Sequence, residues 1–293
     1  MTPSVDAFLK TAWADHGDHP QDVAERLSES IRLIQAPEEF APYVRLVTHV
    51  YGEHLGQWQG AVELLDRLRT LPATAASPDV ATTIDQAVAT MRFAAGDATA
   101  LDGLPLEARV SALATAASAL AARDELLRAI DALECALQLA EAGLPAGSPA
   151  TRALAVAGNN LAAVLEGKPE RNAMQTAAML VAAEAGLKYW KLAGTWLEEE
   201  RAEYRLARSQ LLAGKASDAA ASAQRCIAVC RRNGAPAFEQ FFGFAVLALA
   251  QRSAGDREAS DANRAEAMRQ LEGVSSEERQ WCGAELAELS AMD

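Results

Sequence analysis

The sequence predicts an all-α protein built from stacked helix pairs, and composition, periodicity and repetition all lead to this fold class. Half of the 293 residues are apolar but only 5% are aromatic, and alanine is abundant while valine and isoleucine are sparse. Alanine is the best helix former, whereas sheets need β-branched and aromatic residues to cover a pleated face. Apolar residues also recur at three- and four-residue steps, which is the period of one helix face.

Four stretches repeat the same pattern, and each begins with a residue typical of a turn. The stretches are LGQWQGAVELLDRLRTLP, ARDELLRAIDALECALQLA, AGKASDAAASAQRCIAVC and AGDREASDANRAEAMRQL. Their turn residues are Gly56, Asp124, Gly214 and Gly255. An amphipathic segment precedes each stretch, so the predicted unit is helix, short turn, helix, returning about every 40 residues.

The remaining segments are assigned in chain order. Residues 1–36 predict two short helices, separated at GDHP, that cap the amino end of the array. Residues 38–272 hold the helix-pair repeats. Loops are placed at 72–78, 96–104, 143–149, 167–170, 191–195 and 232–236. Residues 275–293 predict a terminal capping helix with Ser275 or Ser276 as its N-cap. No linker interrupts these parts, so residues 1–293 are expected to form a single domain.

The charge of the chain argues against several classes of partner. A net charge of −13 repels phosphate backbones and anionic lipid, so neither a nucleic-acid nor a membrane partner is expected. The first residues lack a basic region followed by an apolar run, and no apolar segment reaches the roughly 18 residues of a membrane span. The four cysteines show no disulfide-rich pattern. We expect a soluble, cytoplasmic protein.

Residues that could carry metal or catalytic chemistry are few. His49 and His54 lie five residues apart, about 140° around an α-helix, so we expect them to point in different directions. His16 and His19 fall in a turn-like segment. Cys226 and Cys230 share a helix face, but two thiols alone make no zinc site, and we interpret them as buried apolar side chains. No nucleophile or phosphate-binding motif is present. We therefore expect no metal, no cofactor and no catalytic residue.

The repeating unit resembles the tetratricopeptide repeat (TPR) in a degenerate form. The residues that match its consensus are Gly56, Trp58, Ala61, Leu65 and Pro72 in one unit, and Leu206, Ala207, Gly214, Ala219, Ala223 and Cys226 in another. The segment NNLAAVL, 159–165, resembles the first helix of the longer kinesin-light-chain-like repeats. This resemblance covers most of residues 40–272. It implies a right-handed α-α superhelix, a TPR-like solenoid of antiparallel helix pairs with a concave groove.

The resemblance also implies where a ligand would bind, because the first helix of each TPR pair lines the groove. If Leu161 and Ala162 pack inside their unit, the two preceding asparagines face the groove. In the following unit Leu206 and Ala207 are the corresponding packing pair. The predicted groove residues are Asn159, Asn160, Arg201, Tyr204, Arg205 and Arg208.

Asparagine can bond a peptide backbone, and arginine can grip a carboxylate. The lysines of the TPR carboxylate clamp are not evident, which argues against recognition of a terminal carboxylate. The alternative is a purely structural role. In that case the asparagines satisfy backbone groups between helices, and the arginines pair with Glu198–Glu200 and Glu203.

Three classes of function remain open at this point. The first is a non-enzymatic scaffold or adaptor that binds a peptide segment or a partner helix in the groove. The second is a sensor of small molecules or signal peptides that acts through a partner protein, as repeat arrays do in bacterial regulators. The third is an enzyme on a helical-repeat scaffold, which the absence of a catalytic motif disfavours. The oligomeric state stays open, a homodimer included.

Overall fold

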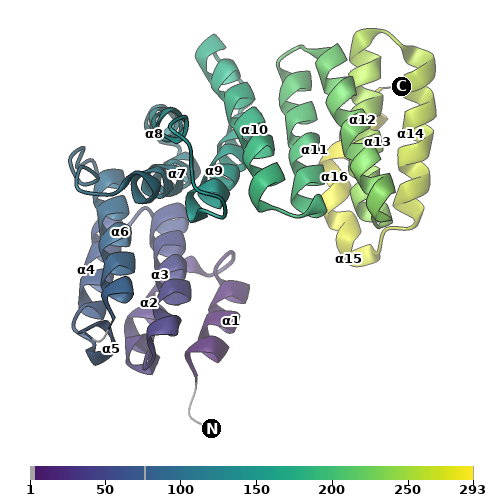
Figure 1. The fold of residues 1–293 in the computed structure, drawn as a ribbon. Helices are drawn as coiled ribbons and strands as arrows, with labels where there is room; N and C mark the ends of the chain where they lie inside the picture. The colour runs from purple at the N-terminus through teal and green to yellow at the C-terminus, as the bar shows by residue number, and fades with distance from the viewer. Residues whose placement is uncertain (1–3, 76, 293) are drawn as a thin grey trace. The chain divides into compact units, whose positions relative to one another are not determined.

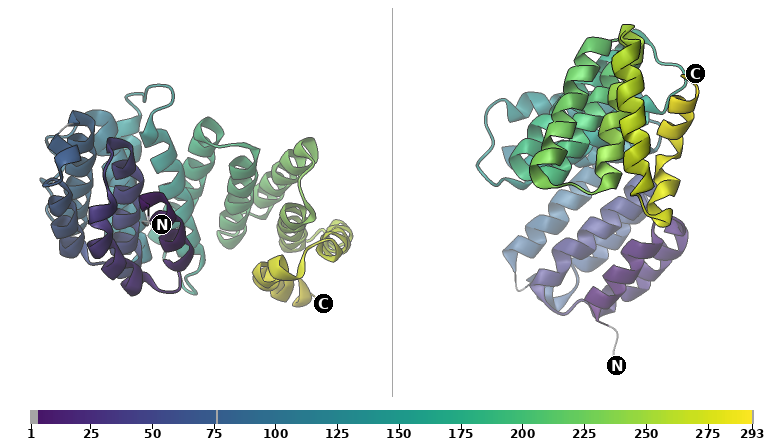
Figure 2. Two further views of the ribbon diagram at one scale, coloured as in Figure 1. Left: turned by 90° about the horizontal axis from the view of Figure 1, so that it is seen from below. Right: turned by 90° about the vertical axis from the view of Figure 1, so that its right-hand side faces the viewer.

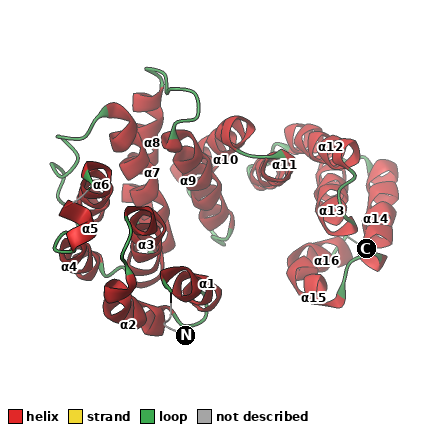
Figure 3. Ribbon diagram, turned by 60° about the horizontal axis from the view of Figure 1, so that its bottom comes forward, coloured by secondary structure: helices red, strands yellow, loops and turns green. Residues whose placement is uncertain are grey.

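The computed structural model describes residues 4–75 and 77–292 of the chain. Over these residues every regular element is a helix and none is a strand (Figure 3). The chain divides into two compact units, Met1–Leu154 and Ala155–Asp293, and the boundary falls within helix α9, Pro149–Glu166. The all-α class is therefore confirmed. The single domain and the right-handed twist stay predictions.

The first unit consists of short helices that each pack against a neighbour in the chain. Its helices are α1 (Val5–Asp15), α2 (Pro20–Ser30), α3 (Phe40–Thr48), η3 (His49–Leu55), α4 (Trp58–Leu68), α5 (Pro72–Ala75), α6 (Pro78–Ala94), α7 (Leu106–Ala122) and α8 (Leu126–Ala140), with the 3₁₀ turns η1 (Ile31–Leu33) and η2 (Pro37–Glu39). Helix α1 contacts α2 and α3, α4 contacts α6, and α7 contacts both α6 and α8 (Figure 1). Ala61, Leu65 and Leu68, which follow one another at steps of four and three residues, are fully buried, so this face of α4 is turned to the core.

The second unit stacks its helices in chain order. After the end of α9 come α10 (Ala173–Ala193), α11 (Trp196–Leu212), α12 (Ala216–Asn233), α13 (Ala237–Ala254), α14 (Arg257–Glu272), α15 (Ser276–Arg279), the 3₁₀ turn η4 (Gln280–Cys282) and α16 (Gly283–Ser290). Each helix from α10 to α13 packs on the next, and α11 also contacts α13. Helix α16, drawn in yellow in Figure 2, packs against α13. Contacts between alternate helices are what a stack of helix pairs produces.

All four predicted turn residues adopt the left-handed backbone conformation. Their φ angles are 63° at Gly56, 64° at Asp124, 74° at Gly214 and 87° at Gly255. At three of these turns the next residue donates its backbone N–H to the carbonyl five positions earlier. The donor–acceptor distances are 2.9 Å for Glu125 to Leu120, 2.9 Å for Lys215 to Gln210, and 3.0 Å for Asp256 to Gln251. These bonds satisfy carbonyls at the end of the first helix of each pair.

Replacing Gly214 by alanine should lower the free energy of unfolding by about 1 kcal/mol, because a Cβ disfavours the left-handed conformation. No atom lies within 4 Å of the added Cβ, so the effect comes from the backbone alone. Urea denaturation measures the change. An unchanged midpoint for Gly214→Ala would contradict the turn assignment.

The sequence-based expectation for His49 and His54 is wrong because their segment is not an α-helix. Residues His49–Leu55 form a π-helix, η3, in which hydrogen bonds join residues five apart and so place those residues on the same face. The Nε2 atoms of His54 and His49 are 3.2 Å apart. At the end of η3, Gln57 donates its N–H to the carbonyl of Tyr51 at 2.8 Å, six positions earlier.

Several predicted boundaries differ from the structure. The predicted loop at 72–78 contains the short helix α5, and α12 continues to Asn233, inside the loop predicted at 232–236. The terminal helix is interrupted, with α15 and α16 separated by η4. Its predicted cap is confirmed, because Ser275 accepts the N–H of Glu278 at 3.2 Å in a capping box. The predicted loop at 191–195 is shorter, since α10 continues to Ala193 and Thr195 already caps α11. None of the helices in the described ranges combines the length and apolarity needed to cross a bilayer.

Candidate functional site

Four of the six predicted groove residues line one cavity in the second unit. This cavity, called here the α11 cavity, has a volume of about 430 Å³. Its lining residues are Asn159, Glu200, Arg201, Tyr204, Arg205, Phe238, Glu239, Phe242 and Trp281. The structure thus brings together Asn159 from α9 with Arg201, Tyr204 and Arg205 from α11. Asn160 and Arg208 are not among the lining residues.

Gly158, which precedes the two asparagines, determines how closely this part of α9 approaches α10. Helices α9 and α10 meet at Gly158 and Gly186, where a Cβ on Gly158 would lie 2.6 Å from both the carbonyl oxygen of Ala182 and the N of Gly186. Only glycine permits so close an approach of two backbones. On the other side of the asparagines, Leu161 is buried as the TPR resemblance implied. Asn159 is therefore held on a rigid helix–helix contact.

The side chains of Asn159 and Asn160 are half-buried. Among the hydrogen bonds between described residues, none involves either side-chain amide. No hydrogen bond among the described residues therefore supports the alternative in which the asparagines satisfy backbone groups between helices, and both alternatives stay predictions. The amide of Asn159 keeps a donor and an acceptor for a ligand in the α11 cavity.

The arginines of α11 do form ion pairs, but with other partners than the alternative predicted. Arg201 bonds Glu239 on α13, with Nη2 2.5 Å from Oε1, and Arg205 bonds Glu166 on α9. Ser209 supports the same Glu166 at 2.6 Å. The charges of these two arginines are therefore largely neutralised within the protein.

The other ion pairs of α11 involve residues that do not line the α11 cavity. Arg208 forms a bidentate pair with Glu288 on α16, with both distances 2.7 Å. Glu203, which was expected to pair with an arginine of α11, instead accepts Lys191 at 2.9 Å and Arg225 at 3.0 Å. Glu203 lies on the side of α11 that faces α10 and α12. The arginines of α11 therefore pair with carboxylates on other helices.

Aromatic side chains form one wall of the α11 cavity. Tyr204 donates its hydroxyl hydrogen to Glu285, and its ring meets Phe242 edge to face with centroids 5.4 Å apart. Phe238 packs on Phe242 in the same manner at 5.1 Å. Burial raises the pKa of Tyr204 well above its usual value, so the phenol remains a donor. Trp281 is 69% exposed, which is unusual for so large an apolar side chain.

Glu200 contributes a neutral carboxyl group to the cavity. Its side chain is 1% exposed, and burial raises its pKa to about 9, with Cys230 and Glu239 adding to the rise. Cys226 donates its Sγ–H to Oε1 of Glu200 at 3.0 Å. The Nε atom of Arg205 is buried without a hydrogen-bond partner in the described structure. A side-chain hydrogen bond to Glu239 also raises the pKa of Glu200, so the unused hydrogen-bonding capacity of the lining is that of the Arg205 Nε.

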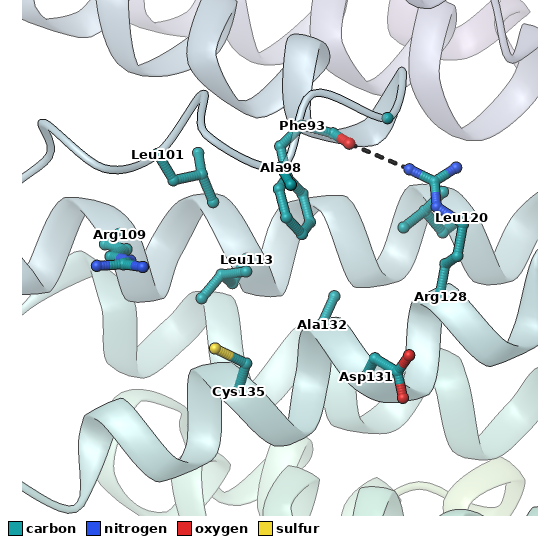
Figure 4. Close-up of a pocket in the computed structure, with 11 residues that line it drawn as sticks. Phe93, Ala98, Leu101, Arg109, Leu113, Leu120, Arg128, Asp131, Ala132 and Cys135 are labelled. Atoms are coloured by element: carbon teal, nitrogen blue, oxygen red, sulfur yellow. Dashed lines mark hydrogen bonds between the residues drawn. The ribbon is translucent and has the colours of Figure 1, made fainter.

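A second cavity, of about 340 Å³, lies in the first unit and contains none of the predicted groove residues. Figure 4 shows Phe93, Leu101 and Leu113 around it, with Arg128 at one end. Arg128 donates to the carbonyl of Phe93 at 3.1 Å and to that of Ala94 at 2.8 Å. This guanidinium therefore closes the carboxyl end of α6, and its role is structural.

Sequence reasoning missed Phe238, Phe242 and Trp281 in the aromatic wall, and the burial of Glu200 and Glu239 in the α11 cavity. Phe238 and Phe242 lie four residues apart on α13, which is the first helix of its pair. Aligning α13 with α11 by repeat position, as was done for Tyr204, could have identified them. Glu200 and Glu239 were indistinguishable from solvated glutamates. Trp281 belongs to the carboxy-terminal segment, and no repeat position predicts its place.

Comparison with known proteins supports the fold and nothing finer. No protein-family model matches the chain, and no curated protein matches it. Among solved structures, a protein of Podosopora anserina described as a kinesin light chain with nearly identical TPR-like repeats matches with a TM-score of 0.50 and 16% identity, covering 81% of this chain and 97% of that one. A variant of the same protein matches with a TM-score of 0.49 and 16% identity, over 81% and 96% of the two chains. The chain thus has a TPR-like fold of stacked helix pairs, as the resemblance in the sequence predicted.

Proposed function

We propose that this protein is a non-enzymatic scaffold or adaptor that binds a peptide segment or a helix of a partner protein in the α11 cavity. One observation carries the proposal: Asn159, Tyr204 and an exposed Trp281 line the same cavity, although they come from three separate parts of the second unit. A protein partner fits the TPR-like fold better than nucleic acid or a membrane does. We place the protein in the cytoplasm.

The chemistry of the lining suggests what the partner presents. Phe238, Phe242 and Trp281 offer apolar contact, and aromatic residues of this kind are frequent hot spots of protein interfaces. Asn159 can bond a peptide group through both its amide nitrogen and its oxygen. Arg201 and Arg205 are already paired with glutamates, so they add little affinity for a free carboxylate. The preferred ligand is a peptide segment with an apolar side chain and no requirement for a terminal carboxylate.

Replacing Trp281 and Asn159 together by alanine should weaken peptide binding about tenfold or more, the effect expected from losing an aromatic anchor and a bidentate amide. The measurement is selection of binders from a displayed peptide library on the full chain, followed by fluorescence anisotropy with the selected peptide. Leu192→Ala is the matched control, because Leu192 is equally exposed at 70% and does not line the cavity. Undiminished binding by the double variant would contradict the assignment.

The second candidate is a sensor of small molecules or signal peptides that acts through a partner. The buried Nε atom of Arg205 favours it, because a donor without a hydrogen-bond partner in the lining of a cavity suits a polar small molecule. A thermal-shift screen with metabolites and short peptides separates the two candidates. Stabilisation by a metabolite, lost in the Asn159 and Trp281 double variant, would favour the sensor over the scaffold.

A further inference from the structure

Three histidines of the first unit converge, although two of them were expected to point apart. His16 ends α1, and His49 and His54 belong to η3. Their ring centroids form a nearly equilateral triangle, with 4.9 Å from His16 to His49, 5.0 Å from His16 to His54, and 4.9 Å from His49 to His54. One ring nitrogen of each lies within 4.8 Å of a nitrogen of the other two.

The spacing matches a metal site. Nitrogens bound to a tetrahedral Zn²⁺ at about 2.0–2.1 Å lie about 3.3 Å from one another, and the rings behind them have centroids about 5 Å apart. The Nε2 atoms of His49 and His54 are 3.2 Å apart. A hydrogen bond between these two rings would explain that one distance, but it would not explain why His16 lies equally close to both.

The outer nitrogens of two rings have the partners that metal-bound histidines usually have. His49 places Nδ1 3.1 Å from Oε1 of Glu53, and His16 places Nδ1 2.7 Å from the carbonyl oxygen of Trp13. An Nδ1–H that donates to a carboxylate or a carbonyl fixes the ring and leaves Nε2 as the free ligand atom. These contacts are independent of the spacing of the rings, and they too indicate that the histidines bind a metal ion.

The π-helix is the element that makes the arrangement possible. In an α-helix His49 and His54 would face different directions, whereas the wider turn of η3 brings them to one face. The segment is held in place by Arg123, which donates to the carbonyl of His54 at 2.8 Å. Packing against α2 and α7 also supports η3. The protein therefore holds the rings in position without a bound ion.

We propose that His16, His49 and His54 bind a Zn²⁺ ion, with the fourth position left to water. Three neutral imidazoles and an open position form a donor set that Zn²⁺ commonly accepts, and the hard cations Mg²⁺ and Ca²⁺ prefer oxygen ligands. All three side chains are half-buried, so the ion can reach them from solvent. The bound ion would join the end of α1 to η3.

The charged groups nearby act on a bound cation in opposite directions, since Glu53 attracts it and Arg123 repels it. Glu53 supplies a carboxylate beside His49, and the guanidinium of Arg123 is engaged by a backbone carbonyl of η3. Arg45 lies over the ring of Trp13, with Cζ 5.4 Å from the centroid. The indole of Trp13 in turn packs against His16 and His49 with centroid distances of 5.0 and 5.1 Å. These contacts shield one side of the site and order the rings.

Metal binding by the full chain tests the proposal, with Zn²⁺ itself as the probe. The metal-free protein is titrated with Zn²⁺ against a chromophoric chelator, and a single tight site per chain is expected. Co²⁺ should produce the visible absorption of a four-coordinate site with nitrogen ligands. His54→Ala should weaken Zn²⁺ binding well beyond tenfold and remove that absorption. Glu53→Gln should weaken binding about tenfold, the usual effect of losing an outer partner.

His19→Ala is the matched control, because His19 lies three residues from His16, is exposed, and stands outside the triangle. It should bind Zn²⁺ as the wild type does. Zn²⁺ should also raise the melting temperature of the wild type and of His19→Ala, but not that of His54→Ala. Circular dichroism without metal shows whether each variant folds. The absence of stoichiometric binding, or equal losses in the His19 and His54 variants, would overturn the proposal.

Discussion

Replacing Gly158 by alanine is expected to lower the free energy of unfolding by about 2–3 kcal/mol, because the new methyl group has no room between α9 and α10. Its Cβ would lie 2.6 Å from the carbonyl oxygen of Ala182 and from the N of Gly186, and 3.0 Å from the Cα of Gly186. These are backbone atoms, so relief requires the helices to separate. The gain in helix propensity from glycine to alanine, about 1 kcal/mol, opposes the loss without cancelling it.

Chemical denaturation monitored by circular dichroism measures this change. Gly283→Ala is the matched control, since Gly283 also lies in a helix of the second unit and no atom comes within 4 Å of its added Cβ. It should leave stability unchanged or slightly higher. Peptide binding in the α11 cavity should weaken together with stability in Gly158→Ala, because Asn159 moves with the helix. If the two glycine variants proved equally stable, α9 and α10 could not be in such close contact.

Replacing Glu200 by glutamine should stabilise the protein at pH 8 by a few kcal/mol and leave it nearly unchanged at pH 5. The folded protein keeps Glu200 protonated up to about pH 9, mainly because the group is buried. In the unfolded chain the same carboxyl ionises near its ordinary pKa of 4.5. The contribution of this group to stability is therefore complete below about pH 4.5 and falls as the pH rises towards 9. The slope is at most about 1.4 kcal/mol per pH unit.

Glutamine removes this dependence because its amide carries no ionisable proton. The groups that face Glu200 are Cys226, Cys230, Glu239 and Arg201, and glutamine keeps the acceptor that Cys226 uses. Urea denaturation of both proteins at several pH values between 5 and 9 gives the difference in stability. Glu199→Gln is the control, because Glu199 is a neighbour on α11 and partly exposed. A difference that does not change with pH would show that Glu200 is ionised in the folded protein.

Much of the fold could be predicted from the sequence, because it depends on local patterns. The turns at Gly56, Asp124, Gly214 and Gly255 were recognisable from residue type, and all four adopt the left-handed conformation. Helix faces were readable from the spacing of alanine and leucine. The two-unit division was not predicted, since it falls inside a helix and no change in composition marks it.

Only those residues of the candidate site that occupy equivalent repeat positions could be predicted from the sequence. Asn159, Arg201, Tyr204 and Arg205 were located by their repeat positions, and they line one cavity. The ion pairs of the arginines were not predictable, because Glu166, Glu239 and Glu288 are distant in sequence and any exposed glutamate offers the same signal. The pKa of Glu200 likewise depends on burial, which a run of glutamates does not reveal.

The π-helix η3 contains one more residue before its turn than the corresponding α-helical segments do. At three turns the closing bond spans five residues, but at Gly56 it spans six, from Gln57 back to Tyr51. The segment therefore holds one residue more than an ordinary repeat needs to reach the same turn. A chain shorter by that residue could close the turn in α-helical register, and its histidines would then diverge. The length of this segment, as much as the identity of its side chains, determines whether the three rings meet.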